Sequence, residues 1–168
     1  MEKTNACRIL EKLGVKFDVI EYPVDPDNLD ARHVAEALGQ DIATVYKTLV
    51  LHGDKNGHFV CVIQGDKEVD LKKAAKASGN KKVAMIPMKE LLPLTGYIRG
   101  GCTAIGMKKA FPVYVDQRCL DHETIHISAG KRGMQIKLSP QDYIQAAKAQ
   151  IADLIKEEMS EDDDNVAG

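Results

Sequence analysis

The chain alternates amphipathic helical patterns with short runs of β-branched and aliphatic residues. Apolar positions recur at helical spacing in residues 4–14, 31–39 and 70–79. Thr4 and Asp70 are suitable N-caps, and each of the three segments ends at a glycine. Strands are predicted near residues 15–19, 45–51, 59–63, 83–85, 111–115, 124–127 and 134–138. The pattern predicts one α/β domain with a mixed, partly closed (partly barrel-like) sheet and flanking helices.

Prolines mark two further helices. Pro87 opens the first, and Ser139-Pro140-Gln141-Asp142 resembles a capping box with proline at the first helical position. Apolar residues then recur at helical spacing, which predicts a long amphipathic helix on Ile144, Ala147, Ile151 and Ile155.

Length and charge give the domain boundaries. A chain of 168 residues suits one domain, which we place at residues 1–156. Residues 157–168 carry six acids and no base, and we expect them to form a disordered tail. Cations cluster at residues 72–82, 99–109 and 131–132, as expected for a polyanionic partner or for solvated helix faces.

The cysteines indicate a reducing compartment. Cys7, Cys61, Cys102 and Cys119 are scattered, without Cys-x-x-Cys spacing or a preceding secretory signal. No apolar run approaches membrane-spanning length. We therefore expect a cytoplasmic protein with no membrane partner.

Lys47 interrupts the apolar strand at residues 45–51. At a period of two, its side chain shares a sheet face with Val45, Leu49 and Leu51. Such a lysine either snorkels to an edge, where it deters aggregation, or points into a pocket and meets an anion. Both interpretations follow from this segment.

Two glycine-rich segments are candidate ligand loops. Residues 100–106 have glycines at both ends, where backbone can approach a ligand and direct free N–H groups at an oxyanion. Residues 128–133 combine two glycines, two cations and a hydroxyl. Ordinary turn chemistry explains either segment alone.

Residues 122–126 match H-E-x-x-H, the motif of zinc proteases. That chemistry requires a helix, whereas Thr124, Ile125 and Ile127 favour a strand. We therefore reject a zinc site here.

Three segments together resemble a known family. Residues 45–49, 100–106 and 128–133 occur in the order and spacing of the YbaK/EbsC family, relatives of the editing domain of bacterial prolyl-tRNA synthetase. The resemblance covers roughly residues 3–155 and includes residues 70–76 and 95–97. It implies a curved mixed sheet with flanking helices, no metal or other cofactor, and removal of mischarged cysteine from tRNA(Pro) in trans.

The resemblance also implies roles for individual residues. Lys47 and the backbone N–H groups of Gly101 and Cys102 are the catalytic candidates. The cysteine thiol of the substrate is expected to attack its own ester, so that the enzyme needs no nucleophile. Substrate binding is assigned to Tyr22, Thr48, Gly100, Ser128, Gly130, Lys131, Arg132 and Gln135.

Three departures from the family pattern leave the preferred amino acid open. Gln135 replaces a common aspartate, Ala104 replaces a usual proline, and residues 28–30 lack an aromatic residue. Alanine or serine could therefore replace cysteine as the substrate amino acid. The expected partners are the acceptor end of aminoacyl-tRNA and prolyl-tRNA synthetase, not DNA. A non-catalytic module that binds tRNA or the synthetase is the alternative.

Overall fold

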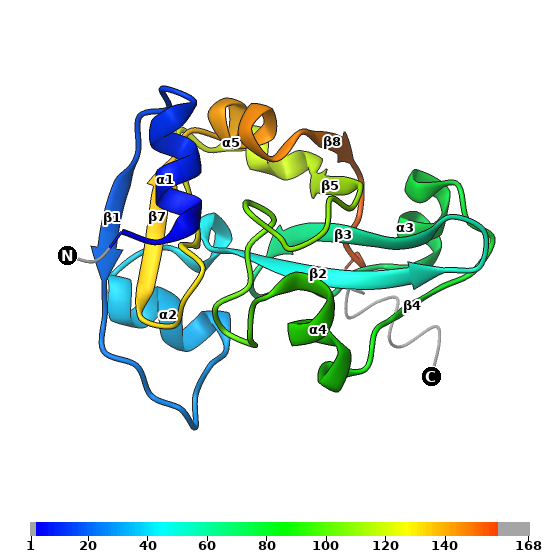
Figure 1. Ribbon diagram of the computed structural model, residues 1–168, viewed down its shortest axis with the longest axis horizontal. Coiled ribbons are helices and arrows are strands. Elements are labelled where there is room, and N and C mark those ends of the chain that lie inside the picture. The colour runs from blue at the N-terminus through cyan, green and yellow to red at the C-terminus, as the bar shows by residue number, and fades with distance from the viewer. Residues whose placement is uncertain (1–2, 158–168) are drawn as a thin grey trace, which may run out of the picture.

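A computed structural model describes residues 3–157 and shows five α-helices around two sheets (Figure 1). The expected acidic tail lies outside these residues, apart from Glu157. The helices are α1 (Asn5–Lys12), α2 (Ala31–Leu38), α3 (Leu71–Ser78), α4 (Leu91–Thr95) and α5 (Pro140–Ala147), with 3-10 turns η1 (Ile42–Thr44), η2 (Met88–Glu90) and η3 (Gln117–Asp121). None of the described helices is long and apolar enough to cross a membrane.

The larger sheet has five strands in the order β4-β2-β3-β5-β8. Strands β2 and β3 form a long antiparallel hairpin, and β5 and β8 continue the sheet in parallel. Their bounds are β2 (Tyr46–Gly53), β3 (Gly57–Gln64), β4 (Val83–Met85), β5 (Val113–Asp116) and β8 (Ala149–Ala152).

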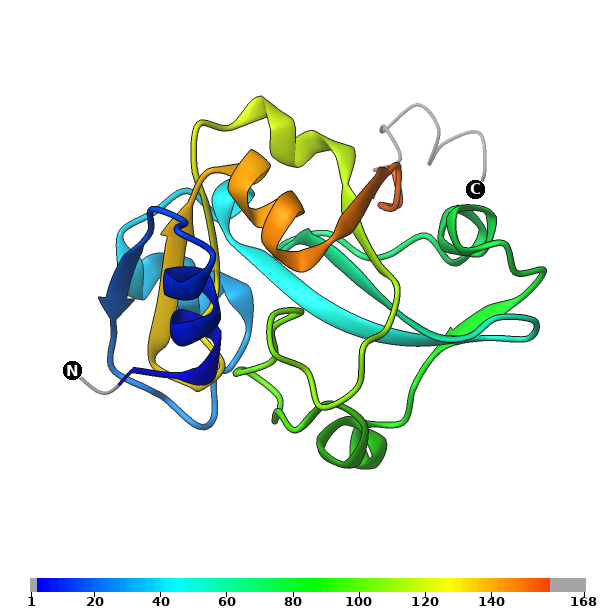
Figure 2. The same cartoon turned by 45° about the horizontal axis from the view of Figure 1, so that its top comes forward.

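The smaller sheet is antiparallel, in the order β1-β7-β6. Its strands are β1 (Asp18–Glu21), β6 (Ile125–Ser128) and β7 (Met134–Leu138). An isolated bridge between Val45 and His126 connects it to the start of β2. Figure 2 shows the small sheet with α1 at one end of the molecule, and the β2–β3 hairpin extending to the other.

Local capping explains where the helices begin and end. The side chains of Thr4, Asp70 and Ser139 accept hydrogen bonds from backbone N–H groups in the first turn of α1, α3 and α5. Gly39 and Gly79 end α2 and α3 in the left-handed conformation, at φ 67° and φ 73°. These predicted helix boundaries are confirmed.

Helices cover the two faces of the larger sheet. α1 and α5 pack against the core that contains Val60 and Val62, which extends over the small sheet. On the other face, α3 covers Phe59 and Ile63. A small cluster joins α2 to Val45. Alternate residues of β3 thus enter separate cores, as a strand buried on both faces requires.

The α/β domain with a mixed sheet and flanking helices is confirmed, but the strands form two open sheets and not a partly closed barrel. The prediction of a long final helix is wrong beyond Ala147, where α5 ends. Lys148 adopts φ 53°, and residues 149–152 then pair with β5. That pairing satisfies the backbone as well as a helix would, so helical spacing alone could not exclude it.

The carboxylate of Asp116 is fully buried at the end of β5. It accepts hydrogen bonds from Gln64 Nε2 at 3.0 Å and from the Leu154 N–H at 3.0 Å, and it pairs with Arg118 Nη1 at 3.1 Å. These contacts join β3 and η3 to the segment that follows β8. Asp116 therefore fixes the chain after β8 against the sheet.

We expect Asp116→Ala to lower the free energy of unfolding by about 3–5 kcal/mol, because buried donors lose their shared acceptor. Urea denaturation measures the loss. Glu68→Ala, which removes an exposed pair with Lys156, is the control and should cost less than about 1 kcal/mol. Equal losses in the two variants would contradict the structural role of Asp116.

His126 is a buried titratable residue on β6, with 1% of its surface exposed. Thr44 Oγ1 donates to the Asp41 carbonyl, so the 3.2 Å contact with His126 Nδ1 requires the imidazole to donate. Nε2 then has no partner among the described residues. Burial lowers the pKa of His126, and nearby Lys137 lowers it further.

This histidine should make stability depend on pH. Because the folded-state pKa lies below the unfolded value of about 6.5, the unfolded chain takes up the proton first. Stability is complete above that pH and falls as the pH drops below it. Urea titrations between pH 7.5 and 5.5 should show a smaller loss of stability for His126→Asn than for the native chain. His52→Asn, which replaces an exposed histidine, is the control and should show the native loss.

Candidate active site

A cavity of about 520 Å³ lies along strand β2, between α2 on one side and α4 on the other. Strand residues 45–50 form its base. Leu29, Asp30, Ala31 and Val34 come from the α2 side, and Met88 and Leu91 from the α4 side. A cavity of this size accommodates a ligand as large as a nucleoside with an attached amino acid.

The cavity occupies a gap in the pairing of β2. Strand β4 pairs with β2 only from Leu51 onward, and the Ile86 N–H donates to the Val50 carbonyl at 3.2 Å. Since alternate residues of a strand direct their N–H and C=O groups to the same edge, those of Thr48 face the same side as Val50. No described strand pairs there, so the Thr48 main chain borders the cavity.

Lys47 is half-buried and lines the cavity. Its Nζ donates to the Gly65 carbonyl at 3.2 Å. Burial lowers the pKa of Lys47, while the carboxylates of Glu68 and Asp66 oppose the shift. Thr48 lies next to Lys47 in a regular strand, so its side chain takes the opposite sheet face, as the sequence predicted.

The loop at residues 100–102 reaches the cavity through Gly100 and Cys102. The Gly101 N–H donates to the Ile98 carbonyl at 2.9 Å and is therefore engaged in a turn. The N–H of Cys102 has no hydrogen-bond partner within residues 3–157. Of the two predicted backbone donors, that of Cys102 is available to a ligand.

The Cys102 thiol itself is not activated. Burial raises its pKa to about 12, and a hydrogen bond with Thr95 only partly offsets this effect. At neutral pH the group is a thiol and a poor nucleophile. The chemical contribution of Cys102 is therefore limited to its backbone.

Gly101 has a packing role. A Cβ on Gly101 would lie 3.0–3.2 Å from backbone atoms of Lys131 and Arg132. The glycine thus allows the two ligand loops, far apart in sequence, to lie in direct contact.

Ser128 and Gln135 face each other across β6 and β7 and both line the cavity. Each is at least nine-tenths buried. Ser128 Oγ accepts from the Gly130 N–H at 3.2 Å, whereas Gln135 Oε1 has no partner among the described residues. Gln135 therefore presents a buried acceptor beside the cavity.

The remaining predicted site residues lie beside the cavity and do not line it. Tyr22 and Arg132 border a much smaller neighbouring pocket. Arg132 Nε donates to the Arg99 carbonyl at 2.9 Å. Gly130 packs against the Tyr97 ring, and Lys131 is exposed in the same loop.

The sequence did not identify the two helical walls of the cavity. Arg99 belonged to a recognised cationic cluster, but Asp30, Met88 and Leu91 carried only helix-forming or capping signals. Nothing in their spacing indicates a shared cavity, because the placement of α2 and α4 on its two sides depends on the tertiary fold.

The H-E-x-x-H segment is not on a helix. His122 follows η3, and His126 lies on β6 with Nδ1 engaged by Thr44. The predicted strand is confirmed. Among the described residues, no group of three or more His, Cys, Asp or Glu side chains has an arrangement that could hold a metal ion.

Comparisons with known proteins identify relatives. EbsC of Enterococcus faecalis, provisionally named a Cys-tRNA(Pro)/Cys-tRNA(Cys) deacylase, is 48% identical over 157 residues, covering 94% of this chain and 96% of EbsC. YwhH of Bacillus subtilis is 27% identical over 125 residues, covering 74% of this chain and 78% of YwhH.

Solved structures share the fold. A crystal structure described provisionally as a trans-editing enzyme for prolyl tRNA synthetase matches with a TM-score of 0.80 and 25% identity, covering 93% of this chain and all of that one. The hypothetical protein APE2540 matches with a TM-score of 0.83 and 21% identity, covering 91% of this chain and all of its own.

A protein-family model also matches this chain. The model of the aminoacyl-tRNA editing domain matches residues 25–146, which include β2, both ligand loops and the whole lining of the cavity. Because this model matches most of the chain and EbsC is 48% identical over nearly its whole length, the chain belongs to the aminoacyl-tRNA editing domain family.

Proposed function

We propose that this chain is a trans-editing deacylase that removes cysteine from mischarged tRNA(Pro). The observation that carries the proposal is the cavity on β2, which Lys47 and Cys102 both line. The name of the relative EbsC, which specifies Cys-tRNA(Pro) and Cys-tRNA(Cys), supports cysteine as the amino acid.

Ester cleavage places negative charge on the carbonyl oxygen of the amino acid. The Lys47 ammonium and the Cys102 N–H are the donors that would stabilise this oxyanion. Among the described residues, the hydrogen-bond partner of Lys47 Nζ is the uncharged Gly65 carbonyl at 3.2 Å, which leaves the ammonium able to pair with the oxyanion. Gln135 Oε1 offers an acceptor for the substrate's amino group.

The site offers no activated nucleophile of its own. Among the described residues no histidine lines the cavity, and the Cys102 thiol is held protonated by its raised pKa. A cysteinyl substrate supplies its own thiol. Its sulfur attacks the ester carbonyl carbon, the bond from that carbon to the ribose oxygen breaks, and the thiol proton passes to the released ribose hydroxyl, leaving a thiolactone.

Selectivity for tRNA(Pro) fits a partnership with prolyl-tRNA synthetase. The cavity is built for an amino acid and its terminal nucleoside, so it reads little of the tRNA beyond that end. A synthetase bound to the same tRNA would supply the missing recognition. The similarity to a structure described as a trans-editing enzyme for prolyl tRNA synthetase supports this partner.

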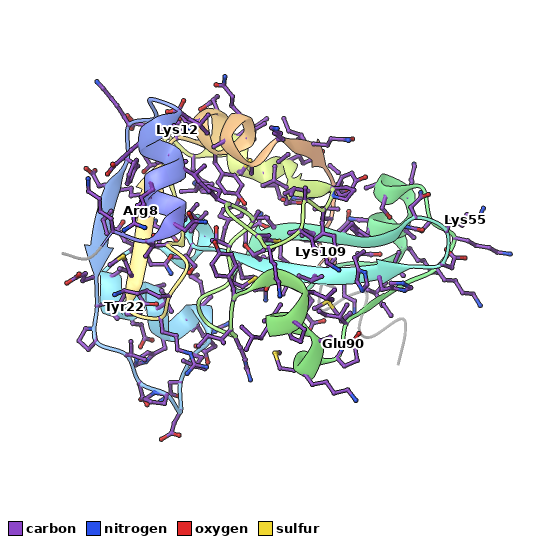
Figure 3. All side chains as sticks on the ribbon, in the orientation of Figure 1. Arg8, Lys12, Tyr22, Lys55, Glu90 and Lys109 are labelled. Atoms are coloured by element: carbon purple, nitrogen blue, oxygen red, sulfur yellow. The ribbon has the colours of Figure 1, made fainter. Side chains whose placement is uncertain are left out.

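We expect Lys47→Ala to slow deacylation of Cys-tRNA(Pro) by about 10²–10³-fold, because one charge-stabilising donor is lost. The measurement compares tRNA(Pro) charged with cysteine, alanine or proline. Lys55→Ala, at the tip of the β2–β3 hairpin, is the control (Figure 3). Full activity in a folded Lys47→Ala would remove Lys47 from the mechanism, and a preference for alanine would reassign the substrate.

Cys102→Ala should retain deacylation within about threefold, because it keeps the backbone N–H and removes only an unreactive thiol. Single-turnover rates with Cys-tRNA(Pro) measure this. A loss as large as that of Lys47→Ala would show that the Cys102 thiol takes part in the reaction.

A further inference from the structure

The chain segments on the two sides of the cavity differ in charge, and each contributes one charged residue to the lining, Asp30 and Arg99. On the α4 side, residues 88–109 contain four cations and one acid, Glu90. On the α2 side, residues 25–41 contain five acids and one cation, Arg32. The local capping roles of Asp30 and Asp41 explain two of these acids but leave their charge in place. A polyanion that approaches the cavity is therefore attracted to the α4 side and repelled by the α2 side.

The α4 side also exposes apolar surface. Met88, Leu92 and Ile98 are 60%, 54% and 45% exposed. Lys89 directly follows Met88, and Arg99 directly follows Ile98. The Lys108 N–H donates to the Thr95 carbonyl at 2.9 Å, which places Lys108 at the end of α4. We define the α4 face as Met88, Lys89, Leu92, Ile98, Arg99 and Lys108.

We propose that the α4 face binds the unpaired 3′ end of the tRNA while the aminoacyl ester occupies the cavity. The inference rests on the proposed function. Cations beside apolar side chains suit a single-stranded nucleic acid, whose phosphates meet the lysines and whose bases pack on the apolar groups. Met88 and Arg99 belong both to this face and to the cavity lining, so the surface is continuous with the site.

The charges also orient the substrate. The α-amino group of an aminoacyl ester is cationic, so it is attracted to the acidic α2 wall, on which Asp30 borders the cavity. The phosphates are attracted to the opposite wall. Only one of the two ways of placing the ester across β2 satisfies both preferences, and it directs the tRNA over α4 and away from α2.

The test is the salt dependence of RNA binding by Lys89→Gln/Lys108→Gln. Both lysines are exposed and neither lines the cavity. The matched control is Arg8→Gln/Lys12→Gln, which removes the same charge from exposed positions on α1, far from α4 in the view of Figure 3. The probe is a labelled acceptor-stem hairpin with an unpaired 3′ end, and its Kd is measured by fluorescence anisotropy.

Two lost phosphate contacts should reduce the slope of log Kd against log salt by about 1.4, so that binding weakens about sevenfold less between 50 and 200 mM salt than in the native chain. The control should keep the native slope. A native slope in Lys89→Gln/Lys108→Gln, or an equal reduction in the control, would overturn the α4 face as the RNA site.

Deacylation of a cysteinyl ester of adenosine, which lacks phosphates, separates this inference from the proposed function. We expect Lys89→Gln/Lys108→Gln to cleave it at the native rate. If the native chain cleaves no ester but the salt slope still falls, the deacylase proposal fails and the α4 face stands. If esters are cleaved and the slope is unchanged, only the α4 face fails.

Discussion

The interrupted pairing of strand β2 is the constraint on which the site depends. β2 bridges to the small sheet at Val45 and pairs with β4 from Leu51, so the strand between them has one open edge. An unpaired edge buried by side chains would leave backbone groups without partners. A cavity at this edge allows a ligand or solvent to satisfy them, and it brings Lys47 to the same space.

The chemistry of the site follows from this position. Its main elements are a half-buried cation, a free backbone donor from a loop and a buried amide acceptor, and none of them is a strong nucleophile. Such a set can bind and polarise an ester but contributes little attacking power. The reactive group must then come from the substrate or from water, which links the identity of the amino acid to the rate of the reaction.

The sequence predicted elements well where local signals agree. The helix at residues 31–38 and the strands at residues 83–85 and 134–138 match the structure residue for residue, because caps, glycines and β-branched runs act over a few residues. It failed at residues 149–155. There the helical spacing of Ile151 and Ile155 competes with parallel pairing to β5, a contact more than 30 residues away in sequence.

The sequence by itself therefore determined the α/β class, the ligand loops and the unusual position of Lys47. Only the tertiary structure decided which of these residues share a cavity. It joined Lys47 and Cys102 to Ser128 and Gln135, left Lys131 and Arg132 at the side, and placed α2 and α4 on the two sides of the cavity. The physical reason is range: capping and periodicity act between near neighbours, whereas a cavity depends on packing between segments that no local pattern relates.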